Sequence, residues 1–228
     1  MKHSGRARRA AFKLIIYAFI AVVAILLVAI VAVLLGTFVV SIIPILLGAW
    51  IVFSLFTLYF FRDPEPTVPA GANIVVSPGH GKVDVIDNMT EAQFMGGECQ
   101  RLSIFLSVIN VHVQNAPVGG KITFYKYSTG EFMNAIRSEC ANCNENVLLG
   151  FEASEPAGEK VGLRLIAGVI ARRIVPFVKE GDTVARGERI GLIQFGSRLD
   201  VYLPRSAKIK VNLNDNVVGG QSILAVFQ

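Results

Sequence analysis

The most prominent pattern in the sequence is an apolar stretch over residues 14–61 that contains no Asp, Glu, Lys, Arg or His. A single straight helix of these 48 residues would be about 72 Å long, whereas the hydrocarbon core of a bilayer is roughly 30 Å thick. The natural break is Gly36-Thr37, which leaves residues 14–35 and 38–61, each long enough to cross once. The pattern therefore predicts a transmembrane hairpin of two apolar helices.

The residues before the hairpin indicate its orientation. Residues 1–13 hold five basic side chains and no acidic one, so the positive-inside rule places them in the cytoplasm. A hairpin returns the chain to the side from which it started, so we expect residues 62–228 at the cytoplasmic face of the cell membrane. The alternative is a cleaved signal peptide, but its apolar region usually has about 7–15 residues, far fewer than this stretch.

Residues 62–228 show a period of two, which is typical of strands. Alternating or short apolar segments stand between Gly and Pro residues, for example at 101–108, 121–127 and 161–166. The pattern predicts a mainly β protein, in which the membrane hairpin is followed by an all-β body large enough for one domain.

A repeat lies near the C-terminus of this body. Residues 178–193 match residues 211–226 with an offset of 33, and both copies have the pattern V-x-x-[GN]-D-x-V-x-x-G-x-x-[IL]. Two such units build the small β-sandwich of lipoyl- and biotinyl-type carrier domains, so we expect that architecture here. The segment between the copies has no Lys at its tip for the swinging arm of a carrier, and Gly196-Ser197 stands there instead.

Composition and charge narrow the partners. Hydrophobic residues make up 53% of the chain and charged residues 17%, against about 25% charged in a typical soluble domain. The net charge of +5 comes entirely from residues 1–13. A neutral body argues against nucleic-acid binding, and the basic tip fits contact with anionic lipid. Cys140 and Cys143 have CxxC spacing, but without a second pair or a nearby His we predict no metal site.

A family resemblance extends over residues 59–228. The sequence resembles the phosphatidylserine decarboxylases, in particular their short membrane-anchored form. No single motif carries this resemblance, which rests on the order and spacing of Phe60-Phe-Arg-Asp-Pro64, Ser77-Pro-x-x-Gly-Lys-Val83, Val111-His112, Ala116-Pro117-Val118-x-Gly120, Asn144-Glu145, Ile166-Ala-Gly-x-x-Ala-Arg-Arg-Ile174 and Gly187-Glu-Arg-Ile-Gly-Leu-Ile-Gln-Phe-Gly-Ser-Arg-Leu-Asp200.

The resemblance implies a proenzyme that makes its own cofactor. In the family the Ser of a Gly-Ser pair attacks the preceding carbonyl, and β-elimination of the resulting ester cleaves the chain and leaves a pyruvoyl group. Here the bond would be Gly196–Ser197, and fragments 1–196 and 197–228 would stay together as a heterodimer. The pyruvoyl group from Ser197, without metal or pyridoxal phosphate, would form a Schiff base with the serine headgroup and decarboxylate phosphatidylserine to phosphatidylethanolamine at the membrane surface.

The resemblance also implies roles for individual residues. His112 matches the catalytic His of the family, which implies general acid–base work in self-cleavage and protonation of the carbanion during turnover. Arg172 and Arg173 are candidates for binding the lipid phosphate, and the alternative is a solvated pair at a strand edge.

The sequence departs from the family pattern close to the site. His80 stands where the family usually has the Asp that orients the catalytic His, so we assign His80 to the site in its place, with Asp84 and Asp87 as alternative carboxylates nearby. Gln114-Asn115 and Asn146 also replace the usual residues.

Two other functions remain open at this point. The first is decarboxylation of a related serine ether lipid, whose headgroup chemistry is identical. The second is a catalytically inactive, membrane-anchored β-sandwich adaptor, which the departures favour and the intact Gly196-Ser197 and His112 oppose. The sequence also leaves open a homo-oligomer.

Overall fold

The computed structural model describes residues 6–130, 144–168, 173–194 and 197–228. The chain divides into two compact units, Met1–Thr57 and Leu58–Gln228. The first consists of most of α1 (Arg6–Phe60). The described part of the second contains the strands β1 (Ile74–Val76), β2 (Gly81–Glu91), β3 (Gly97–Leu106), β4 (Val113–Asn115), β5 (Gly120–Ser128), β6 (Asn146–Ser154), β7 (Ala157–Ala167), β8 (Ile174–Pro176), β9 (Thr183–Val184), β10 (Arg189–Ile193), β11 (Ser197–Leu203), β12 (Lys208–Ile209), β13 (Asn216–Val217) and β14 (Ile223–Val226).

The apolar N-terminal helix is confirmed, but it does not have the break that we expected at Gly36-Thr37. α1 is continuous through this dipeptide and through Pro44. The helix continues because its backbone hydrogen bonds form within one segment and do not depend on the residue type at a single Gly. The Thr37 hydroxyl also fits into the helix, since Oγ1 donates to the Leu34 carbonyl oxygen (2.9 Å). The apolar part, Ile15–Phe60, has 46 residues, more than twice the roughly 20 that one crossing needs. The two-armed hairpin in a bilayer therefore stays a prediction.

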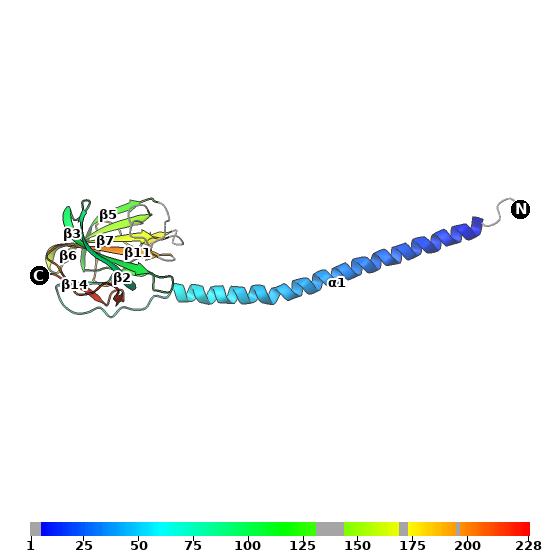
Figure 1. Cartoon of the computed structure of the whole chain (residues 1–228), viewed down its shortest axis with the longest axis horizontal. Coiled ribbons are helices and arrows are strands. Elements are labelled where there is room, and N and C mark those ends of the chain that lie inside the picture. Colours follow the sequence, from blue (N-terminus) through cyan, green and yellow to red (C-terminus); the bar gives the residue numbers. More distant parts are fainter. Residues whose placement is uncertain (1–5, 131–143, 169–172, 195–196) are drawn as a thin grey trace. The chain divides into compact units, whose positions relative to one another are not determined.

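The body is built on one large antiparallel sheet, which confirms the mainly β prediction. Its eight strands have the order β13-β2-β3-β11-β7-β6-β5-β9. Figure 1 shows β11 in orange among the green and yellow strands of this sheet. β11 pairs over its whole length with β3 on one side and over most of it with β7 on the other. It is therefore a central strand, hydrogen-bonded along both edges.

Two smaller sheets, β1-β14-β12 and β4-β10-β8, complete the body. Every second residue of β11 after Ser197 contributes to one core cluster with apolar residues of these small sheets. The core thus lies between the large sheet and the two small ones, as expected for a layered β fold. Its members from β11, β10 and β14 are Leu199, Val201, Leu203, Ile190, Ile193, Leu224 and Ala225.

The repeat found in the sequence has the same local structure in both copies. Gly181 and Asn214, offset by 33 residues, have positive φ angles of 94° and 76°. Gly187 and Gly220 do so as well, at 79° and 68°. Positive φ is the conformation in which Gly and Asn meet little steric penalty, so the two copies of the repeat turn at equivalent residues.

A second internal repeat was missed by the sequence analysis. The segment Ser77-Pro78-x-x-Gly81-Lys82 recurs at Ala116-Pro117-x-x-Gly120-Lys121, offset by 39 residues. Gly81 pairs with Val217 of β13, and Gly120 pairs with Val184 of β9. The order of the large sheet is consequently symmetric about the β11–β7 pair, with β2 and β3 on one side matching β5 and β6 on the other.

We expect Gly120→Ala to destabilise the body. An added Cβ would clash with the main-chain carbonyl oxygen of Glu152, which the neighbouring strand holds in place. The free energy of unfolding of the full chain in detergent, measured by urea titration, should fall by about 2 kcal/mol or more. Gly97→Ala is the matched control, because nothing lies within 4 Å of its added Cβ. An equal effect of the two substitutions would contradict this packing.

Candidate active site

Ser197 begins the central strand and is completely buried. Its main chain pairs with Leu106 of β3 and with Ala167 of β7. Within the described residues, Ser197 Oγ has no hydrogen-bond partner. A buried hydroxyl without a partner is rare and unfavourable by about 1–3 kcal/mol, and here it belongs to the predicted nucleophile. Gly196, the other half of the predicted cleavage site, lies outside the described residues.

His112 is buried beside the segment that leads to Ser197. Its carbonyl oxygen accepts a hydrogen bond from the Ile193 N–H (3.2 Å), four residues before Ser197. Its ring stacks on Phe60, with 4.4 Å between the ring centroids. Its Nδ1 lies 2.9 Å from the Asn110 carbonyl oxygen. A carbonyl oxygen only accepts, so Nδ1 carries the proton and Nε2 is the basic nitrogen of the neutral ring.

Burial above all, together with the positive charge of Arg62, lowers the pKa of His112 to about 4 against the opposing effect of the Asn110 carbonyl. The imidazole is therefore neutral at pH 7, as a general base requires. Burial and the Arg62 charge also lower the pKa of the half-buried His80. Both histidines thus lie within reach of one guanidinium charge.

The loop that carries His80 packs onto the site end of β11. Ser77 Oγ donates to the Gly79 carbonyl oxygen (2.7 Å), and the Asn115 N–H donates to the Pro78 carbonyl oxygen (2.8 Å). A Cβ on Gly79 would stand 2.5 Å from Leu199 Cδ1, so a larger residue here would force the Leu199 side chain to move. The structure therefore brings three segments to one end of the large sheet: residues 77–81, the connection that ends at His112, and the start of β11.

Asp84 and Asp87, the alternative carboxylates, both pair with arginines. Both Asp84 oxygens accept from the guanidinium of Arg198, with Nη1 at 2.9 Å from Oδ1. Asp87 forms a two-bond pair with Arg101, with Nη2 at 2.6 Å from Oδ2. Arginine forks match carboxylates in this way, so both carboxylates hold the sheet together instead.

The sequence analysis also missed the buried polar layer on the other face of β11. Side chains alternate along a strand, so Arg198 and Asp200 lie opposite to Ser197 and Leu199. Both are almost fully buried, and Ser103 Oγ donates to Asp200 Oδ1 (2.6 Å). Burial raises the pKa of Asp200, with Ser103 and three arginines opposing this. The strict alternation in Ser197-Arg-Leu-Asp200 was the available signal.

Asn144 and Glu145, two motif residues without an assigned role, lie one strand away from Ser197. The Asn144 side chain donates to the Ala167 carbonyl oxygen (2.7 Å), and the Ala167 N–H donates to the Glu145 carbonyl oxygen (2.9 Å). Ala167 is the residue paired with Ser197. The main chain of the buried Glu145 is thus attached to the strand that flanks the nucleophile.

Gln114 and Asn115, which stand in place of the usual family residues, hydrogen-bond to the backbone of the site. Gln114 Nε2 donates to the His112 carbonyl oxygen (2.6 Å), and Asn115 Nδ2 donates to the Gly187 carbonyl oxygen (2.8 Å). The other replacement, Asn146, donates through Nδ2 to the Asn144 carbonyl oxygen (2.8 Å). These amides hold the strands that carry the site.

The remaining predicted residues are placed only in part. Arg172 lies outside the described residues, as do Cys140 and Cys143. Arg173 is exposed, and its carbonyl oxygen accepts from the Gln194 N–H (3.2 Å), so it lies beside the segment that precedes Ser197. Among the described residues, no group of three or more His, Cys, Asp or Glu side chains has an arrangement that could hold a metal ion.

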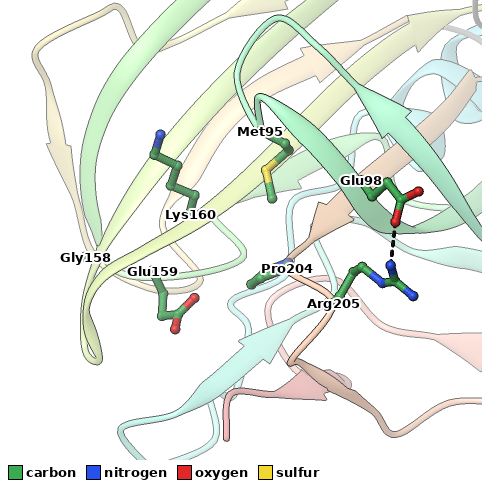
Figure 2. Close-up of a pocket in the computed structure, with 7 residues that line it drawn as sticks. All are labelled: Met95, Glu98, Gly158, Glu159, Lys160, Pro204 and Arg205. Carbon is green, nitrogen blue, oxygen red and sulfur yellow. Dashed lines mark hydrogen bonds and ion pairs between the residues drawn. The ribbon is translucent and has the colours of Figure 1, made fainter.

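The shallow pocket in Figure 2 lies at the other end of the large sheet. It is formed near the start of β3 and the end of β11, away from Ser197. The only ion pair drawn there joins Glu98 and Arg205. None of the predicted catalytic residues is among those that line it, which are Met95, Glu98, Gly158, Glu159, Lys160, Pro204 and Arg205.

Comparison with known proteins agrees with this geometry. Residues 53–225 match the family described as phosphatidylserine decarboxylase. The chain belongs to that family. It is 44% identical to the phosphatidylserine decarboxylase proenzyme of Desulfotalea psychrophila over 74% of this chain and 78% of the relative. The corresponding proteins of Syntrophus aciditrophicus and Geotalea uraniireducens are 42% and 40% identical, over 76% and 80% of this chain and 81% and 84% of the relatives.

Membership of the phosphatidylserine decarboxylase family confirms the resemblance and makes the chain a carboxy-lyase. The printed names of the relatives describe them as proenzymes. The family match includes Ser197, His112 and His80, and it also includes the last turns of α1.

We expect the stability of the body to fall in mild acid because of His112. The folded pKa of about 4 is below the unfolded value of about 6.5, so the unfolded chain binds the proton first as the pH falls. Between pH 7 and pH 4.5 this should remove about 2 kcal/mol of the free energy of unfolding. Urea titrations of the uncut Ser197→Ala chain, with and without His112→Gln, measure the effect as a difference in slope against pH. Equal slopes would contradict the buried neutral imidazole.

Proposed function

We propose that the protein decarboxylates phosphatidylserine to phosphatidylethanolamine at a membrane surface, after it has cleaved itself at Gly196–Ser197. The observation that carries this proposal is the buried Ser197 hydroxyl, which has no partner in the described part of the chain and stands at the first position of the central strand. Family membership supports the substrate and the reaction. The pyruvoyl group derived from Ser197 is the cofactor that we propose.

Self-cleavage begins with addition of Ser197 Oγ to the carbonyl carbon of Gly196. His112 Nε2 accepts the hydroxyl proton, which a neutral imidazole does at pH 7. The peptide C–N bond breaks, the proton passes to the released amine, and an ester remains. Loss of the Cα proton of residue 197 then expels the Gly196 carboxylate and leaves dehydroalanine, which water converts to the pyruvoyl group and ammonia.

The mature site needs few groups from the chain. A pyruvoyl group at position 197 would supply an electrophilic carbonyl to combine with the substrate amine and stabilise the negative charge left by CO2. His112 then delivers a proton to the carbon that has lost its carboxylate. Phe60 and the core around Ser197 exclude water from this position. We assign the lipid phosphate to Arg172 and Arg173, and anionic lipid to the basic N-terminus.

His80 does not suit the role of the orienting group, because an imidazole has no fixed negative charge to stabilise His112 when it is protonated. The Asn110 carbonyl orients the His112 ring instead. We therefore propose His80 as a proton carrier close to the site and not as the orienting group.

We expect the purified chain to consist of two polypeptides, residues 1–196 and 197–228, the second blocked at its N-terminus. Ser197→Ala should give one chain of 24.7 kDa, because the nucleophile is absent. Ser206→Ala is the control, since that serine is exposed at a turn. Intact-mass spectrometry and trapping with borohydride distinguish the outcomes. A wild-type chain that stays whole and resists trapping would refute the enzymatic proposal and favour the adaptor.

We further expect both ends of the chain on the cytoplasmic side. A stretch of 46 apolar residues fits a bilayer of roughly 30 Å only when it crosses twice or leaves apolar surface in water. Fusions of green fluorescent protein and of alkaline phosphatase to each terminus measure the topology, with fluorescence and no phosphatase activity expected at both. Opposite results at the two ends would indicate a single crossing.

A further inference from the structure

The connection between β3 and β4 exposes two neighbouring apolar residues close to the site. Val108 is 38% exposed and Ile109 is 61% exposed, while His112 three residues later is fully buried. The turn has a defined shape, because Asn110 Oδ1 accepts from both the N–H (2.9 Å) and the hydroxyl (2.8 Å) of Ser107. Two exposed aliphatic side chains on an ordered turn are unfavourable in water.

This turn is attached to the end of the apolar segment. Arg62 is the first charged residue after residues 14–61. Its Nη2 donates to the Ile109 carbonyl oxygen (2.7 Å), and its Nη1 donates to the Tyr59 carbonyl oxygen (2.7 Å). A charged residue that ends a membrane-spanning segment lies at the membrane–water interface. By these contacts Ile109 lies beside Arg62, so we expect both residues at the same depth.

Two aromatic side chains complete the surface. Tyr59 is 49% exposed and Phe61 is 40% exposed, and the Arg62 guanidinium lies 3.9 Å above the Tyr59 ring. Tyr is enriched where a membrane protein meets the headgroup layer, because its ring is apolar and its hydroxyl is wet. We call Tyr59, Phe61, Arg62, Val108 and Ile109 the interfacial rim.

We propose that the interfacial rim inserts into the headgroup layer of the bilayer, so that the protein contacts lipid at a second point beside the site as well as through α1. This deepens the proposed function and rests on it, since it assumes an anchored enzyme with a lipid substrate. Arg62 joins the rim to the site, because its charge acts on both His80 and His112. A serine headgroup held at the rim is therefore near the catalytic histidine without leaving the membrane surface.

A second copy of the chain is a poorer occupant of this surface. A stable protein interface covers about 800 Å² on each partner, and the exposed parts of the five side chains of the rim are well below that area. Because the rim follows directly on the apolar segment, the lipid around that segment can cover the rim, and no further partner is needed.

Fluorescence quenching tests the inference independently of activity. The only Trp of the chain is Trp50, so Trp50→Phe/Ile109→Trp carries one reporter at the rim. In vesicles of brominated phosphatidylcholine we expect its emission to be quenched. Trp50→Phe/Ala157→Trp is the control, because Ala157 starts β7 ten residues before Ala167, about 33 Å along the strand from the site end. Absent quenching at 109, equal quenching at both positions, or a blue shift without quenching at 109 would each overturn the proposal.

An activity assay separates this inference from the proposed function. Ile109→Ser should lower kcat/KM for phosphatidylserine in vesicles by about fivefold to tenfold, and it should leave the value for a short-chain phosphatidylserine dissolved as monomers unchanged. Ile109→Leu should retain both activities. An equal loss on both substrates would overturn the rim. Release of no CO2 by the wild type from either substrate would refute the proposed function, whereas the quenching result would still decide the rim.

Discussion

Main-chain hydrogen bonding along both edges of β11 is the constraint on which the rest of the structure depends. The strand lies between β3 and β7 at the centre of the large sheet. Because its first residue is Ser197, the hydroxyl is held at a fixed end of the sheet, where the Gly79 loop and the connection to His112 also arrive. The Arg198–Asp84 pair reaches across β3 and holds the following residue as well. The site is thus a property of strand register and not of a flexible loop.

Local patterns were sufficient to predict much of the fold. The turn residues Gly181 and Asn214, the strands with period two and the apolar N-terminal helix are all local features, and the structure contains them. The break at Gly36-Thr37 is absent, because nothing in a helix forces it to end at a single Gly-Thr pair when its hydrogen bonds are local. The symmetric halves of the sheet were missed, since the repeat at Ser77 and Ala116 is marked only by a Pro, a Gly and a Lys.

The sequence indicated candidate site residues but not their environment. Ser197 and His112 were identified because their motifs resemble those of a family. That the Asn110 carbonyl orients the His112 ring, or that Arg198 pairs with Asp84 over 114 residues of chain, depends on which strands become neighbours. Such pairings depend on the tertiary structure and cannot be predicted from a single sequence.

The distribution of residues 197–228 over the body has a consequence for the lifetime of the protein. This segment supplies the central strand β11, the edge strand β13 and two strands of a small sheet. A chain cut before Ser197 therefore remains interlocked and cannot separate without losing its core. Once unfolded, its two fragments would have to associate again by diffusion. Refolding, which is unimolecular in the precursor, would then depend on protein concentration. The precursor would fold once, and the mature form would persist through the slowness of its opening.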